Sequence, residues 1–174
     1  MKRLLLLAAL ALAACSKPEP VSNDLDLDML SAGGSNAIPR PLTNESAETP
    51  GAWRFQASAA GSAATFGTVG DYPAFAIRCE PQTRSIALVR DATVPVHGAM
   101  LEFTTTEGKT ASYPALPANE NRPVAIARAT SGDGFLRGEL SAAKAKITIT
   151  VEGAAPLTVP VDDALRTVIA TCPR

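Results

Sequence analysis

The sequence predicts a mainly β fold of the α+β class: an antiparallel sheet, or a small sandwich or barrel, with a C-terminal helix packed on it. Short runs of alternating apolar and polar residues, separated by turn residues, follow position 51, and this is the pattern of half-buried strands. Strong helical spacing of apolar residues occurs only after Asp162. Two cysteines, Cys79 and Cys172, fall within this region and are expected to brace it.

Residues 1–14 have the organisation of a signal peptide. Lys2 and Arg3 precede an apolar run over residues 4–12, and small residues follow it. A membrane-spanning helix needs about 20 apolar residues, so this run is too short to span a bilayer. We therefore expect the segment to be removed.

Leu12-Ala13-Ala14-Cys15 resembles the lipobox of bacterial lipoproteins. The resemblance implies that Cys15 receives a diacylglyceryl group, that the chain is cut before it, and that its new amino group is acylated. Each buried CH₂ contributes about 0.8 kcal/mol, so two or three chains would anchor the protein. Ser16 implies the inner leaflet of the outer membrane, because retained lipoproteins typically carry Asp there. The alternative is an ordinary secretory peptide with a coincidental cysteine.

Residues 15–50 are predicted to comprise the lipidated cysteine and a disordered tether, because acids outnumber Lys17 and Arg40 and prolines recur. A flexible chain of this length spans roughly 30–35 Å. Within it, residues 24–30 alternate acidic and apolar side chains. This stretch is either part of the disordered tether or a strand that docks on a sheet edge of this domain or of a partner.

Residues 51–174 are predicted to form one β-rich globular domain. Residues 147–152 and 157–159 are expected to pair as a hairpin around the turn at 153–155, and residues 106–109 form another hairpin turn. Such alternation favours an antiparallel sheet with one solvated face. The other expected strands are marked by Trp53, Phe55 and Ala57; Thr65 and Phe66; Phe75, Ile77 and Cys79; Ile86 and Leu88; Leu101 and Phe103; and Val124, Ile126 and Arg128.

Two segments are predicted to be helical. Residues 133–142 form a weaker candidate, because Gly134 and Gly138 interrupt it. The last segment is stronger, because Asp162 can cap it and Asp163 lies in its first turn. Its apolar stripe is formed by Leu165, Val168, Ile169 and Cys172.

Cys79 and Cys172 are expected to form a disulfide. Both fall on apolar faces of their elements, and an even pair in an oxidising compartment reads as one bridge. The alternative is a pair of free buried thiols. Closing a loop of about 90 residues stabilises the fold by about 4–5 kcal/mol in the loop-entropy model.

Charge limits the classes of partner. The formal net charge is −1 and becomes about −3 once Lys2 and Arg3 are removed with the signal peptide. A nucleic-acid-binding protein would carry a strongly basic face, so we expect no nucleic-acid partner.

Several segments resemble small periplasmic lipoproteins of sphingomonad-type alphaproteobacteria, and the likeness covers most of residues 51–174. The segments are Trp53-Arg54-Phe55, Phe66-Gly67, Ala74-Phe75-Ala76-Ile77-Arg78-Cys79, Arg84-Ser85-Ile86-Ala87-Leu88 and Val168-Ile169-Ala170-Thr171-Cys172. The resemblance implies a periplasmic β-rich domain and no particular activity. Thr110-Ala111-Ser112-Tyr113 is similar to the loop of periplasmic c-type lysozyme inhibitors, although no glycine follows the serine; this makes Ser112 and Tyr113 a candidate binding loop.

No catalytic or metal site is predicted. His97 is the only histidine, and it lacks an evident nucleophile and orienting group, so a surface loop position is expected. Ser141-Ala142-Ala143-Lys144 matches the Ser-x-x-Lys pattern without its companion motifs. Arg78, Arg84 and Arg90 would form either a basic stripe or ordinary solvated strand positions.

We therefore expect a non-enzymatic envelope lipoprotein that needs no cofactor. Its partners would be the membrane, through Cys15, and an envelope protein that contacts a sheet edge or the loops at 91–98 and 114–123. The alternatives are an inhibitor of a lytic enzyme such as c-type lysozyme and, less favoured by the residues, a hydrolase.

Overall fold

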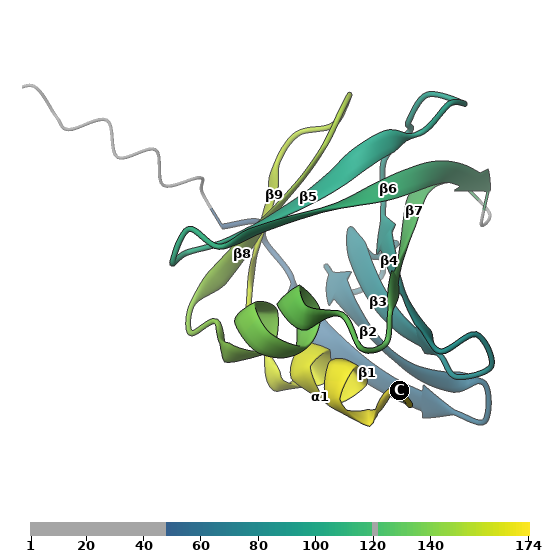
Figure 1. Ribbon diagram of the computed structural model, residues 1–174. Helices are drawn as coiled ribbons and strands as arrows, with labels where there is room; N and C mark the ends of the chain where they lie inside the picture. The colour runs from purple at the N-terminus through teal and green to yellow at the C-terminus, as the bar shows by residue number, and fades with distance from the viewer. Residues whose placement is uncertain (1–47, 120–121) are drawn as a thin grey trace, which may run out of the picture. The chain divides into compact units, whose positions relative to one another are not determined.

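The computed structural model describes residues 48–119 and 122–174. The predicted signal peptide, Cys15, nearly all of the predicted tether and its 24–30 segment lie outside the described residues. The described part contains nine strands, a π-helical segment and one α-helix (Figure 1).

The elements follow one another as β1 (Ala52–Ser58), β2 (Gly61–Gly67), β3 (Phe75–Glu80), β4 (Ser85–Arg90), β5 (Ala99–Thr105), β6 (Thr110–Asn119), β7 (Pro123–Thr130), η1 (Phe135–Leu140), β8 (Lys146–Val151), β9 (Leu157–Pro160) and α1 (Asp163–Thr171). The mainly β fold with a C-terminal helix is confirmed.

All nine strands belong to one antiparallel sheet with the order β1-β2-β3-β4-β7-β6-β5-β8-β9. The meander β5-β6-β7 is inserted in reverse, so β4 pairs with β7 and β5 pairs with β8. The predicted hairpin over residues 147–159 is β8 paired with β9, with Thr148 opposite Thr158.

The sheet curls into a half-barrel, and hydrogen bonds join its first strand to its last. The indole Nε1 of Trp53, on β1, donates to the carbonyl oxygen of Pro160, on β9, over 2.7 Å. The backbone N–H of Thr49, just before β1, donates to the carbonyl oxygen of Thr158 over 2.9 Å. The edge of β9 is therefore partly covered by the segment that leads into β1.

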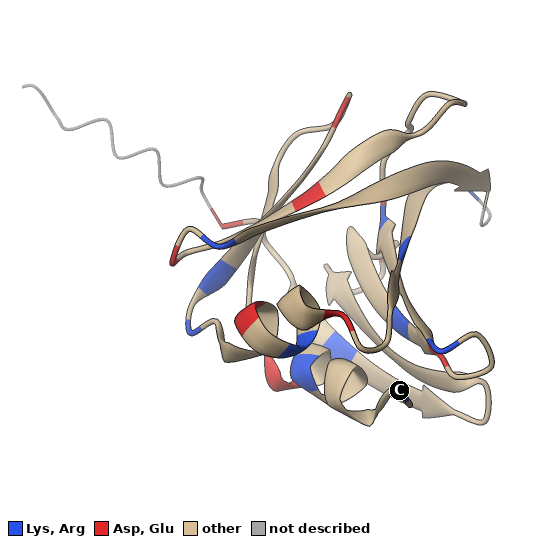
Figure 2. Cartoon of the chain, viewed as in Figure 1, with Lys and Arg blue, Asp and Glu red and all other residues tan. Residues whose placement is uncertain are grey.

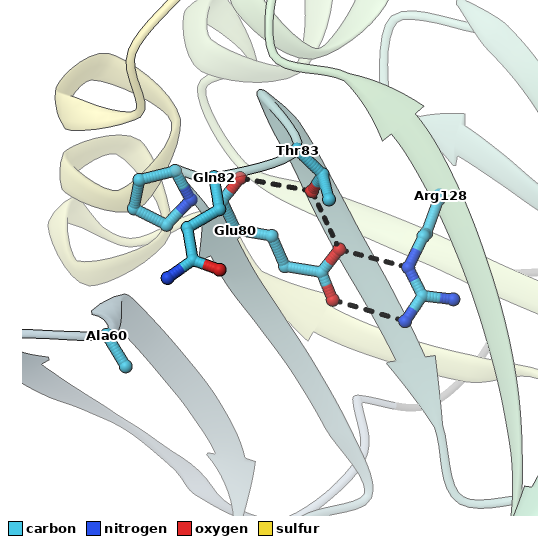
Figure 3. A pocket seen from close by; sticks show the side chains of 6 residues that line it. Ala60, Glu80, Gln82, Thr83 and Arg128 are labelled. Carbon is cyan, nitrogen blue, oxygen red and sulfur yellow. Dashed lines mark hydrogen bonds and ion pairs between the residues drawn. The ribbon is translucent and has the colours of Figure 1, made fainter.

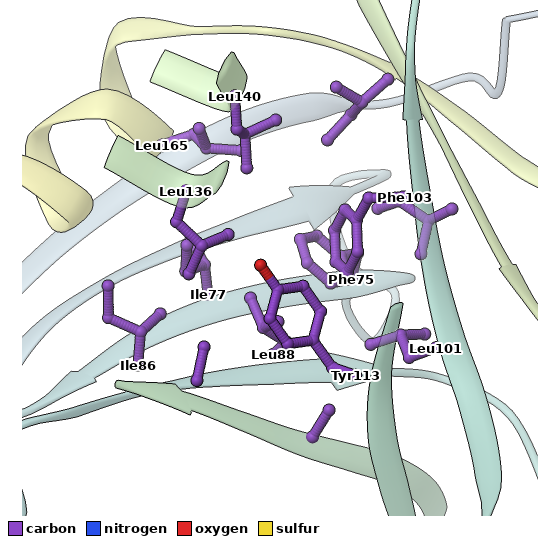
Figure 4. Close-up of a cluster of buried hydrophobic side chains, with 14 of the residues drawn as sticks. Phe75, Ile77, Ile86, Leu88, Leu101, Phe103, Tyr113, Leu136, Leu140 and Leu165 are labelled. Carbon is purple, nitrogen blue, oxygen red and sulfur yellow. The ribbon is translucent and has the colours of Figure 1, made fainter. Parts of the chain in front are cut away.

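The main hydrophobic core lies on the concave face of this sheet. Figure 4 shows side chains from β3, β4, β5 and β6 converging beneath η1 and α1. Phe103 lies at the centre of an aromatic chain, with ring centroids 5.9 Å from Phe75 and 5.8 Å from Tyr113. The concave side is thus filled by side chains and by the two helical elements.

The C-terminal helix forms as predicted. The Asp162 side chain accepts a hydrogen bond from the backbone N–H of Ala164 over 2.8 Å, which caps the helix. Leu165, Val168 and Ile169 are buried, where α1 packs on β1, β2 and β3.

The disulfide between Cys79 on β3 and Cys172 at the end of α1 is present, with Cα atoms 5.4 Å apart. Gly61 makes room beside it, because a Cβ atom at this position would lie 2.3 Å from the carbonyl oxygen of Cys79. Its φ of 130° also favours glycine. The start of β2 can therefore approach the bridge closely.

The weaker helix differs from the expectation. The segment Phe135–Leu140 is π-helical, and the Asp133 side chain accepts a hydrogen bond from the backbone N–H of Leu136 over 2.9 Å at its start. Gly134 and Gly138 have low α-helix propensity. The π-helical turn is therefore stabilised by its contacts with the rest of the domain and not by local propensity.

Candidate functional site

The convex face of the sheet carries a second apolar cluster, which is unusual for a solvated face. Ala76, Ala87, Val89 and Val124 are buried there, and Ile126 packs against them. On β7 the inward positions are instead taken by Ala125, Ala127 and Ala129.

Strand register aligns these outward-facing residues in a row across the sheet. Thr65 lies opposite Ala76, Ala76 opposite Val89, Val89 opposite Ile126, and Ile126 opposite Leu116. The row crosses β2, β3, β4, β7 and β6. Small side chains occupy its β2–β3 part, so the surface is depressed between the longer side chains on either side.

This depression is a hollow of about 270 Å³ on the convex face, which we call the outer hollow. Its floor is apolar and is formed by Ala63, Ala76, Val89 and Val124, whereas its rim is formed by Gln56, Thr65, Tyr72, Pro73, Arg78, Asp91 and Arg122. An apolar floor with a few convergent polar groups is the usual composition of a ligand site.

Arg122 organises one side of the rim. Its Nη2 lies 2.5 Å from the Asp91 carboxylate and donates to the carbonyl oxygen of Pro73 over 3.3 Å. Its guanidinium carbon lies 4.6 Å from the centroid of the Tyr72 ring, a cation–π distance. Since Tyr72 is 59% exposed, the rim presents an aromatic side chain to solvent.

The outer hollow is the best candidate site because polar side chains from separate strands and connections converge on an apolar floor. Arg78 contributes a second guanidinium from β3. Elsewhere in the described part, basic and acidic residues are interspersed over strands and helices (Figure 2). The outer hollow is lined by two guanidinium groups, from Arg78 and Arg122, and by the carboxylate of Asp91.

A second hollow lies by the turn between β3 and β4, and its charged groups satisfy each other (Figure 3). The Arg128 Nε and Nη2 atoms donate to the two carboxylate oxygens of Glu80 over 3.0 and 3.2 Å. Ser85 also donates to Glu80 over 2.8 Å. The hydrogen bond from Arg128 lowers the pKa of Glu80, with burial opposing and Ser85 adding to the effect. This hollow is therefore better described as a structural ion pair.

The predicted basic stripe of Arg78, Arg84 and Arg90 is not formed. Arg78 faces the convex side with Ala76, whereas Arg90 has the same orientation as Ile86 and Leu88 and is only 8% exposed. The alternative of ordinary solvated strand positions is also wrong for Arg90. Successive side chains of a strand point to opposite faces, so the equal spacing of Arg78, Arg84 and Arg90 along the sequence does not place them on one face of the sheet.

Arg90 is a buried cation that binds backbone carbonyl groups. It donates to the carbonyl oxygens of Ala74, Asp91 and Ala155 over 2.9, 2.8 and 3.2 Å. Burial lowers its pKa, and Asp91 opposes that effect. These bonds tie the ends of β3 and β4 to the β8–β9 turn, so Arg90 braces the fold.

Ser112 and Tyr113 lie within β6 and not in a loop. Ser112 pairs with Glu102 on β5, and Tyr113 is 8% exposed. The Tyr113 hydroxyl donates to the Asp133 carboxylate over 2.8 Å, and Figure 4 shows it within the core. A buried side chain cannot insert into an enzyme. The prediction that Ser112 and Tyr113 lie in a loop was wrong.

The residues considered for catalysis are also placed apart. His97 is exposed in the β4–β5 loop. The Ser141 hydroxyl donates to the carbonyl oxygen of Leu136 over 2.8 Å, and Lys144 is exposed. Within residues 48–119 and 122–174, no three His, Cys, Asp or Glu side chains are grouped as metal ligands would be.

The sequence did not single out the outer hollow. Its residues belong to β1, β2, β3, β4, β7 and three connections between strands, and only the reversed order of β5-β6-β7 brings Val124 beside Val89. The predicted loops at 91–98 and 114–123 contain Asp91 and Arg122 of this hollow, but the second prediction was wrong in part, because residues 114–119 belong to β6 and pair with β5 and β7.

No known protein family, curated protein or solved structure matches this chain. Across the described residues, no helix is both long and apolar enough to cross a membrane.

Proposed function

We propose that this chain is a lipid-anchored periplasmic protein whose β domain is a non-enzymatic binding module of the cell envelope. Cys15 would hold it on the inner leaflet of the outer membrane. The proposal combines the lipobox-like segment of the sequence with the outer hollow of the domain.

The outer hollow is the observation that carries the binding role. Ala76, Val89 and Val124 are each at least nine-tenths buried, although they lie on the convex face of a sheet. A solvated sheet face normally carries polar side chains. An apolar floor under a rim of aromatic and charged groups is the arrangement from which ligand sites are made.

Site-specific photocrosslinking in cells tests the binding role. A photoreactive residue at position 72 would lie on the rim, and a matched one at Lys109 would lie in the β5–β6 turn. We expect an envelope component to be captured reproducibly from position 72 and not from position 109. Equal capture from both positions, or none from either, would contradict the role of the outer hollow.

The anchor is tested separately by metabolic labelling with palmitate. The unchanged chain should incorporate label and sediment with outer membranes, because two or three acyl chains give stable membrane attachment. Cys15→Ser should remove the label and remove the protein from the outer-membrane fraction. A secretory peptide with a coincidental cysteine would instead leave the unchanged chain soluble and unlabelled.

A further inference from the structure

The outer hollow is small and chemically asymmetric. Its volume is about 270 Å³, slightly below the roughly 300–1,000 Å³ of ordinary small-molecule sites. A small occupant, such as a single amino-acid residue or a short branched acid, therefore suits it best.

The cationic side of the outer hollow is held in position before any ligand arrives. The Nη2 atom of Arg122 is held by Asp91 and Pro73, and its guanidinium carbon lies 4.6 Å from the centroid of the Tyr72 ring. Within the described residues, the Nε and Nη1 groups of Arg122 have no hydrogen-bond partner. A guanidinium held in this way loses little conformational freedom when it binds a planar anion.

The apolar side lies next to these cations. Val89 and Val124 are 7% and 6% exposed, and they line the same hollow as Arg78 and Arg122. A ligand that fits both sides must therefore carry a planar anionic group directly on a compact apolar body.

We propose that the outer hollow binds a carboxylate attached to a small apolar group. Arg122 binds the carboxylate, and the apolar group rests on Ala76, Val89 and Val124. This inference rests on the binding function proposed above and names its ligand class. The carboxylate is matched by the guanidinium geometry, whereas Asp91 repels a more highly charged anion.

This chemistry has two sources: a free short-chain carboxylic acid and the C-terminal residue of a peptide. Isovalerate represents the first, and N-acetylalanine represents the second. Isovaleramide and N-acetylalaninamide are matched controls that keep the apolar body and remove the charge.

Methyl NMR of the unlipidated mature chain, made with Cys15→Ser and labelled at valine, measures the binding. We expect saturable shifts of the Val89 and Val124 methyl signals with the acids, and at least tenfold weaker binding of the amides. The acid that binds more tightly identifies the source. Shifts that are equal for acids and amides, or absent from these two valines, overturn the proposal.

Variants locate the anion on the rim. Arg122→Gln should weaken binding of the acids about tenfold or more, and Arg122→Lys should retain part of it because the charge remains. Lys109→Gln, in the β5–β6 turn, should bind as the unchanged chain does. If the Arg122→Gln variant binds the acids normally, and its backbone NMR spectrum shows that it is folded, the assignment of the anion to Arg122 is wrong.

Failure here is distinguishable from failure of the binding function itself. Capture of an envelope component from position 72 without carboxylate binding would reject the ligand class and keep the binding module. If neither capture from position 72 nor carboxylate binding is observed, the binding function and the ligand class are both rejected.

Discussion

The hydroxyl group of Tyr113 is buried between Phe103 and the start of η1. It donates to Asp133 over 2.8 Å, and the same carboxylate accepts from the backbone N–H of Leu136. Burial and then Asp133 raise the pKa of Tyr113 well above its ordinary value. The folded chain therefore holds this proton more tightly than the unfolded chain does.

Tyr113→Phe should change the alkaline stability of the domain. Unfolded tyrosine ionises near pH 10, so the free energy of unfolding falls as the pH rises above about 10 while Tyr113 stays protonated in the folded state. The phenylalanine variant should not show this alkaline loss of stability. At neutral pH its free energy of unfolding should be lower by about 1 kcal/mol, because the hydrogen bond to Asp133 is absent. Melting curves from pH 8 to 11 would measure both effects, and parallel curves for the two proteins would contradict the assignment. Tyr72 is retained in both.

Glu80→Gln should change the acid stability. The folded-state pKa of Glu80 is lowered, chiefly by Arg128, so the stabilisation is present above the ordinary glutamate pKa. It is lost as the pH falls through the folded-state value. We expect Glu80→Gln to cost up to about 1 kcal/mol at pH 7 and almost nothing at pH 3. Glu102→Gln, on β5, is the matched control; a difference that persists at pH 3 would contradict the ion pair.

Single-residue roles were predictable where local patterns decide them. Asp162 was recognised as a helix cap, and the apolar faces of Cys79 and Cys172 followed from periodicity. Arg90 and Tyr113 were misplaced, because their partners lie on elements that only the folded sheet brings near.

At the scale of elements, η1 and α1 cap each other. The guanidinium of Arg137, on η1, donates to the carbonyl oxygen of Cys172 at the end of α1 over 2.6 Å. Arg166, on α1, donates to the carbonyl oxygens of Ser141 and Ala143 after η1 over 3.1 and 3.0 Å. Each arginine thus satisfies carbonyl groups that the end of the other helix leaves without intrahelical partners.

Arg137→Met and Arg166→Met should each destabilise the domain by about 1–3 kcal/mol, because each leaves partly buried carbonyl groups without a charged donor. Arg54→Met, at an exposed position on β1, should change the free energy of unfolding by less than about 0.5 kcal/mol. Urea unfolding would measure all three. Equal effects of the three substitutions would show that the mutual capping contributes nothing specific.

Strands were easier to predict than helices because alternation directly encodes a sheet with one buried face. β8 and β9 follow their predicted pattern closely. In β7 the larger Val124 and Ile126 face the convex cluster, and alanines face the main core. The alternation of residues in this segment correctly predicted a strand. It did not predict which face of the strand contacts the main core.

At the scale of the whole molecule, the disulfide joins β3 to the end of α1 across 93 residues of sequence. The double variant Cys79→Ala/Cys172→Ala should therefore lower the melting temperature by on the order of 10 °C or more. Cys15→Ser should leave it unchanged. A reductant should reproduce the effect in the unchanged chain, and an unchanged melting curve would show that the bridge does not stabilise the fold.

The antiparallel sheet and its helix followed from the sequence, but the strand order did not. Alternation reports which residues face inward and is silent about which strand lies beside which. The outer hollow depends on that order, because Val89 and Val124 meet only where β4 pairs with β7. The fold class was therefore predictable and the candidate site was not.

The long interval between Cys79 and Cys172 also has a consequence for biogenesis. At 5–20 residues per second, the thiol of Cys79 precedes that of Cys172 by roughly 5–20 s during synthesis. The only other cysteine is Cys15, which has already emerged and could form the wrong bridge. The diacylglyceryl thioether proposed for Cys15 would remove that competitor, so the proposed lipid anchor would also leave a single pairing open to the remaining thiols.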